Sequence, residues 1–123
     1  LPMDEFDNLL DRADIVILTL PLTNETKGLF NKEKFDLMKK GALLVNIARG
    51  AVVNTKDLIK ALNQNLGGAV LDVFETEPLE KDSPLWEMEN VIITPHNSFV
   101  GEGNNNRLFD VISENLVKWE EKN

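Results

Sequence analysis

The sequence predicts an α/β fold built on a parallel sheet, and two observations point to this class. First, four short apolar runs rich in valine, isoleucine and leucine have the composition of strands, at residues 13–21, 43–47, 69–74 and 91–96. Second, segments with helical periodicity alternate with these runs, which is typical of βαβ units with right-handed crossovers. The expected architecture is therefore one parallel sheet flanked by helices.

Helices are predicted where a capping residue precedes apolar side chains at helical spacing. Four segments meet this condition: residues 4–12, 31–38, 54–65 and 102–122. Asp4, Asn31 and either Asn54 or Thr55 are the expected caps of the first three, because their side chains can accept hydrogen bonds from unpaired backbone N–H groups. The fourth segment predicts a long C-terminal helix.

The chain is organised around residues 38–54, where an apolar run leads to an arginine set between small residues. The run at residues 43–47 is predicted to be a strand buried on both faces, as in parallel sheets. Such a strand would deliver Arg49 to a carboxyl end, where open α/β sheets bind their ligands. A guanidinium there could hold a planar carboxylate through two parallel hydrogen bonds. The alternative is an arginine that pairs with a nearby Asp or Glu.

Size and composition restrict the classes of function. The chain has 123 residues and 42% hydrophobic residues, which suits one domain with a real core. Its formal net charge of −8 argues against nucleic acid or an anionic membrane surface as a partner. It contains no cysteine, no signal-peptide pattern and no apolar run of about 18 residues, so the predicted location is cytoplasmic.

Four polar residues fall at or just beyond the ends of predicted strands: Arg49, Asp72, Glu77 and His96. Parallel strands bring such ends to one edge of the sheet, so these residues are expected in one crevice. A single histidine argues against a histidine-rich metal site, and no Ser or Cys occupies a strained elbow beside a base. The set suits proton transfer, although His96 could instead be a satisfied core residue. Asp72 could be held by backbone donors or could face a ligand.

Five segments carry a resemblance to a known family, in order and at the family's spacing: ADIVILTLPLTNETKGL, MKKGALLVNIARGAVVN, AVLDVFETEP, SPLWEMENVIITPH and the ENL of the last helix. On these motifs, residues 13–119 resemble the later half of the nucleotide-binding domain of the NAD-dependent D-isomer-specific 2-hydroxyacid dehydrogenases. The resemblance implies a Rossmann-like sheet that ends in a long C-terminal helix. It also implies that NAD is the cofactor, with NADP not excluded, and that the intact protein is a homodimer.

The resemblance assigns roles to residues. Arg49 would hold the carboxylate of a small 2-keto acid, His96 would protonate its carbonyl oxygen during reduction, and Glu77 would keep His96 oriented and charged. Asp72 would position the nicotinamide ring. The full set of implied cofactor contacts is Leu20, Pro21, Thr26, Ile47, Ala48, Arg49, Asp72 and His96. No metal is implied.

Two departures from the family pattern limit what the sequence predicts. The glycine-rich phosphate turn, the acidic residue that reads the ribose and the substrate domain have no counterpart in residues 1–123, which predicts a partial NAD-binding domain. Asn97, Ser98 and Phe99 also replace a small, glycine-rich segment, which leaves the 2-hydroxy acid open. The alternatives are an NAD-responsive scaffold resembling the C-terminal-binding corepressors, or an inactive fragment.

Overall fold

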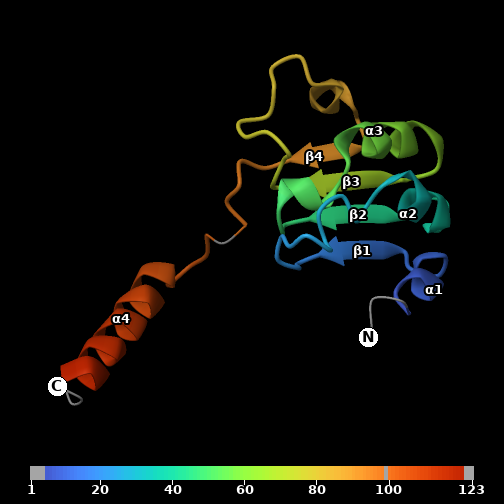
Figure 1. Ribbon diagram of the computed structural model, residues 1–123. Helices are drawn as coiled ribbons and strands as arrows, with labels where there is room; N and C mark the ends of the chain where they lie inside the picture. The colour runs from blue at the N-terminus through green and yellow to red at the C-terminus, as the bar shows by residue number, and fades with distance from the viewer. Residues whose placement is uncertain (1–4, 99, 121–123) are drawn as a thin grey trace.

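The computed structural model describes residues 5–98 and 100–120, and its centre is a four-stranded parallel sheet (Figure 1). The strands follow the order of the chain across the sheet: β1 (Ile15–Leu18), β2 (Leu43–Asn46), β3 (Gly68–Leu71) and β4 (Val91–Ile93). The predicted α/β class is confirmed. Each strand is shorter than the apolar run that predicted it, because the last residues of each run turn into the following loop.

Helices alternate with the strands as expected: α1 (Asp7–Leu10), α2 (Lys32–Leu37), α3 (Thr55–Gln64) and α4 (Asn104–Glu120), with 3-10 turns η1 (Gly50–Val52) and η2 (Pro84–Glu87). Two predicted caps are confirmed, since Asn31 accepts a hydrogen bond from the Lys34 N–H and Asn54 accepts one from the Asp57 N–H. Helix α1 is shorter than expected. Asp4, its expected cap, lies outside the described residues.

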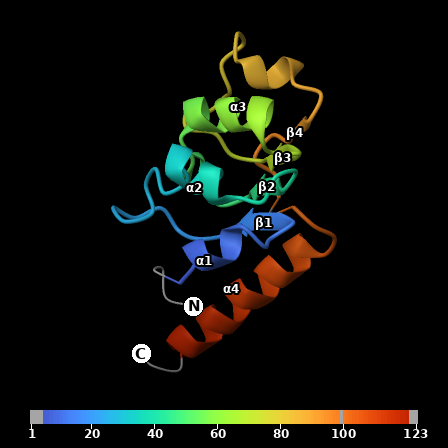
Figure 2. The ribbon, with the colours of Figure 1, turned by 90° about the vertical axis from the view of Figure 1, so that its right-hand side faces the viewer.

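The first three helices lie on one face of the sheet (Figure 2). The core lies between this face and the helices, where Leu18 and Leu44 of the strands are buried together with Phe35 of α2 and Leu58 of α3. The opposite face carries Ile17, which is 57% exposed, and no described helix packs over it. The expectation that residues 43–47 are buried on both faces is therefore wrong, because cover is present on one side only.

Helix α4 leaves the body of the molecule after β4 (Figure 1). Its apolar side chains recur at the predicted spacing, yet none of its described residues is buried. Large apolar faces of this kind are typical of surfaces that contact another domain or chain. No described helix has both the length and the apolar composition needed to cross a membrane.

The strand register decides where the loops meet. Leu18, Asn46, Leu71 and Ile93 are aligned across the four strands, so the segments that follow them leave the sheet at one edge. Neighbouring strands lie about 4.8 Å apart. The loops after β2, β3 and β4 therefore begin at one edge of the sheet, and a single crevice shared by their polar side chains stays a prediction.

Candidate active site

A hollow of about 460 Å³ lies at the carboxyl ends of β1 and β2. It brings together five of the predicted cofactor contacts with two of their neighbours: Thr19, Leu20, Pro21, Leu22, Ile47, Ala48 and Arg49. The lining side chains are apolar except for one threonine and one cation, backbone groups add polar surface, and none of the lining residues is acidic. Such a surface can accept the flat ring of a ligand whose negatively charged group lies in another part of the molecule.

Thr26, another predicted cofactor contact, does not line this hollow. Its side chain is buried, and its hydroxyl donates to the Pro21 carbonyl oxygen at 2.8 Å while accepting from the Thr23 N–H at 2.8 Å. In this structure Thr26 holds the turn that presents Pro21. Direct contact between Thr26 and a cofactor stays a prediction.

Arg49 lies at the rim of the hollow and is exposed. Its Nη1 donates to the Ala48 carbonyl oxygen at 2.7 Å, and within residues 5–98 and 100–120 it forms no salt bridge with a carboxylate. The alternative of a structural ion pair is therefore not observed. A guanidinium without a protein carboxylate is well suited to hold a substrate carboxylate.

Asn46, the last residue of β2, fixes the backbone on both sides of this turn. It is 1% exposed, its Oδ1 accepts from the Ala48 N–H at 3.1 Å, and its Nδ2 donates to the Arg49 carbonyl oxygen at 3.3 Å. Sequence reasoning did not assign it a role. The available signal was an amide side chain inside an otherwise apolar strand, because a buried polar group needs hydrogen-bond partners.

Gly50 brings the turn after β2 against the segment after β3. A β-carbon at this position would lie 1.8 Å from the carbonyl carbon of Phe74, a separation that atoms do not tolerate. Only a residue without a side chain permits this approach. The backbone next to Arg49 is thus packed directly on the segment that leads to Glu77.

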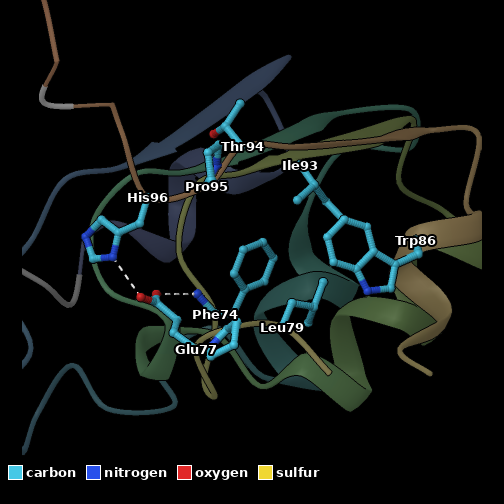
Figure 3. Close-up of a pocket in the computed structure, with 9 residues that line it drawn as sticks. Phe74, Glu77, Leu79, Trp86, Ile93, Thr94, Pro95 and His96 are labelled. Carbon is cyan, nitrogen blue, oxygen red and sulfur yellow. Dashed lines mark hydrogen bonds and ion pairs between the residues drawn. The ribbon is translucent and has the colours of Figure 1, made fainter. Parts of the chain in front are cut away.

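His96 and Glu77 lie within hydrogen-bond distance of each other in the segments that follow β4 and β3 (Figure 3). Glu77 Oε2 lies 2.7 Å from His96 Nδ1, and its Oε1 accepts a hydrogen bond from the Phe74 N–H at 2.9 Å. The Phe74 N–H and then the His96 ring hold the pKa of Glu77 below its ordinary value, so this carboxylate is ionised at neutral pH. Glu75, the other nearby glutamate, accepts from the Thr55 N–H instead.

A second cavity, of about 340 Å³, lies beside this pair. Its walls are largely apolar and include Phe74, Leu79, Trp86 and Ile93 (Figure 3).

Asp72 is 1% exposed and follows β3 directly. Its Oδ1 accepts from the Thr94 hydroxyl and, at 2.9 Å, from the Asn97 N–H, while its Oδ2 accepts from the Ser98 N–H at 2.9 Å. Of the two possibilities left open by the sequence, the structure shows the first, in which the carboxylate is held by donors of the chain. Its contact with a nicotinamide ring stays a prediction.

Comparison with known proteins identifies the family. The sequence profile described as "D-isomer specific 2-hydroxyacid dehydrogenase, NAD binding domain" matches residues 1–98. The chain belongs to this family. The match covers the first three helices, all four strands and every residue assigned to the candidate site, which confirms the resemblance drawn from the motifs.

Dehydrogenases and reductases of the same family are similar over almost the whole chain. A glyoxylate reductase from Pyrococcus horikoshii is 43% identical over 114 residues, which are 92% of this chain and 34% of the relative. Among solved structures, a probable 2-hydroxyacid dehydrogenase from Rhizobium etli in complex with NADP, HEPES and L(+)-tartaric acid has a TM-score of 0.86 at 39% identity, covering 99% of this chain and 40% of that one. An NADPH-dependent glyoxylate/hydroxypyruvate reductase from Sinorhizobium meliloti, in complex with NADP and sulfate, has a TM-score of 0.87 at 32% identity, covering 98% and 39%. The chain thus spans about a third of the length of the relatives it matches.

The contact between Glu77 and His96 predicts how the pKa of Glu77 responds to a substitution at position 96. Replacing His96 by asparagine should raise the pKa of Glu77, because the ring no longer donates a hydrogen bond or contributes positive charge. The rise should be partial, since the Phe74 N–H, the larger cause of the lowered pKa, remains. Carboxyl ¹³C NMR of the chain across the acid range measures this change. An unchanged Glu77 titration would show that the pair does not persist in solution.

Proposed function

We propose that the protein containing this chain is an oxidoreductase that interconverts a small 2-keto acid and the corresponding D-2-hydroxy acid. The observation that supports this most strongly is the 2.7 Å contact between His96 Nδ1 and Glu77 Oε2 at the same sheet edge as Arg49. An imidazole oriented by a carboxylate is a common arrangement for proton transfer, and an exposed arginine suits an acid substrate.

The cofactor in this proposal is NAD or NADP, in contact with the hollow lined by Leu20, Pro21 and Ile47. The absence of acidic side chains among the lining residues fits an anionic dinucleotide. When bound, the reduced cofactor supplies the hydride that the carbonyl carbon receives. Two of the structural neighbours are described as complexes with NADP, which supports a dinucleotide without selecting between the two.

Three side chains of this chain would bind the substrate, transfer the proton and orient the proton donor. Arg49 would hold the substrate carboxylate through two hydrogen bonds and draw electron density from the adjacent carbonyl. His96 would give the proton on its Nε2 to the carbonyl oxygen during reduction and accept it back during oxidation. Glu77, bonded at Nδ1, would fix the plane of the ring and stabilise its protonated form.

The substrate in the proposal is glyoxylate or hydroxypyruvate, because similar proteins carry these names. An assay of the whole protein with glyoxylate, hydroxypyruvate and pyruvate, each with NADH and NADPH, tests it. We expect cofactor oxidation with at least one of the first two acids. The absence of turnover with every pair, combined with NAD-dependent assembly in light scattering, would favour the scaffold alternative. A homodimer in the cytoplasm completes the proposal.

A further inference from the structure

The turn that carries His96 has an unusual backbone conformation. His96 has a φ of 52°, within the left-handed region that residues with a β-carbon rarely adopt. Its own N–H donates to the Thr94 carbonyl oxygen at 3.1 Å, which closes the turn tightly. A conformation of this kind persists only where surrounding contacts enforce it.

Asp72 supplies contacts on both sides of this residue. The hydroxyl of Thr94 donates to Oδ1 before the turn, while the N–H groups of Asn97 and Ser98 donate to Oδ1 and Oδ2 after it, each at 2.9 Å. Asp72 itself directly follows β3, the inner neighbour of β4, and is 1% exposed. A rigid strand end thus anchors a loop that is otherwise exposed.

Charge strengthens this anchor. Burial alone would raise the pKa of Asp72, but the hydrogen bonds from the Thr94 hydroxyl and from the N–H groups of Ser98 and Asn97 outweigh it and hold that pKa well below its usual range. The carboxylate is therefore ionised at neutral pH. Hydrogen bonds to an ionised acceptor are stronger than bonds between neutral groups.

We propose that Asp72 is a positioning residue that holds the His96 turn in its left-handed conformation, so that Nδ1 meets Glu77. This inference rests on the proposed function only in treating His96 as the proton donor. It differs from a direct cofactor contact, because the carboxylate acts through the hydrogen bonds of its own chain. Loss of Asp72 should thus disturb the His96–Glu77 pair without any ligand present.

Asp72→Asn tests the inference in the chain as it stands. The amide keeps the size of the side chain but replaces one acceptor oxygen by an NH₂ donor, so at least one of the Asn97 and Ser98 N–H groups loses its partner. Amide hydrogen exchange at that position should accelerate roughly tenfold or more relative to a core amide such as Ala69. The ¹⁵N and ¹H signals of His96 Nδ1 should also lose the signature of a bond to Glu77.

Asn46→Ala is the matched control. Asn46 is equally buried at the end of the adjacent strand, but its side-chain hydrogen bonds go to the backbone of Ala48 and Arg49, and its own carbonyl, which accepts from the Asp72 N–H, is kept in the alanine variant. It should lower stability while leaving the relative exchange of Ser98 and the His96 signals unchanged. If both variants alter His96 equally, or if Asp72→Asn alters neither readout, the inference is overturned.

Thr94→Val covers the case in which Asp72→Asn does not fold. It removes one of the three donors at nearly constant side-chain size, so a smaller acceleration at Asn97, which shares Oδ1 with Thr94, is expected. No acceleration in a folded Thr94→Val chain contradicts the inference. None of these measurements requires turnover. A protein that is inactive but keeps the hydrogen bonds between Asp72 and the His96 turn would therefore count against the proposed function and not against this inference.

Discussion

Replacing His96 by asparagine is expected to lower turnover of the whole protein by roughly 10²- to 10⁴-fold, the range over which a positioned acid or base contributes to rate. Asparagine tolerates the left-handed backbone that this position requires, so the turn should keep its shape while the proton donor is lost. Steady-state kinetics at saturating reduced cofactor measures kcat, and a fluorescence titration should show that cofactor affinity is retained.

Arg49→Lys is the contrasting variant in the same assay. A lysine keeps the positive charge but cannot form two parallel hydrogen bonds to a carboxylate, so the Michaelis constant for the keto acid should rise as turnover falls. The His96→Asn variant should instead show a lower kcat with little change in the Michaelis constant. If His96→Asn retains more than about a tenth of the parent turnover, another group donates the proton.

Replacing Gly50 by alanine is expected to produce the largest loss of stability among the single substitutions considered for this chain. The new β-carbon would meet the Phe74 carbonyl carbon at 1.8 Å and its oxygen at 1.9 Å, and both are backbone atoms that cannot rotate away. Forced overpacking of this kind costs about 1–3 kcal/mol, and rigid backbone neighbours place Gly50→Ala at the upper end or beyond. Chemical denaturation of the chain measures the loss.

Gly101→Ala is the control for this substitution. A β-carbon there would approach no heavy atom closer than 3.7 Å, so its effect should stay within about 0.5 kcal/mol. Because the Phe74 N–H bonds Glu77, a displaced Phe74 in Gly50→Ala should also shift the NMR signals of Glu77 and His96. Equal stability of the two alanine variants would show that the backbone around Gly50 yields readily.

The sequence predicted the class of fold because its signals are local. Alternating apolar runs, and cap residues such as Asn31 and Asn54, act within a few residues of where they stand. The exposed face of the sheet was not predicted. An apolar residue such as Ile17 gives the same sequence pattern whether its side chain is covered or exposed. Which side of a strand is covered depends on parts of the fold distant in sequence.

For the candidate site, the sequence predicted which strand ends meet and that Glu77 pairs with His96, but not the backbone contacts around them. Strand ends placed Arg49, Glu77 and His96 at one edge, the resemblance paired the last two, and the structure shows that pairing at 2.7 Å. The left-handed turn at His96 and the close approach at Gly50 were missed. Both arise from contacts between segments separated by more than 20 residues, which no local pattern records.

The described interior holds three buried polar side chains, Thr26, Asn46 and Asp72, and each one bonds the backbone of a loop at the site edge. Because these backbone partners cannot be substituted, replacing any of the three side chains by an apolar one would leave a buried N–H or C=O group without its hydrogen bond and lower stability. The same changes would release the loops, so at this edge the stability of the fold and the geometry of the site depend on the same three side chains. Efforts to stabilise the domain are better directed at the exposed residues of α3, which bind none of these loops.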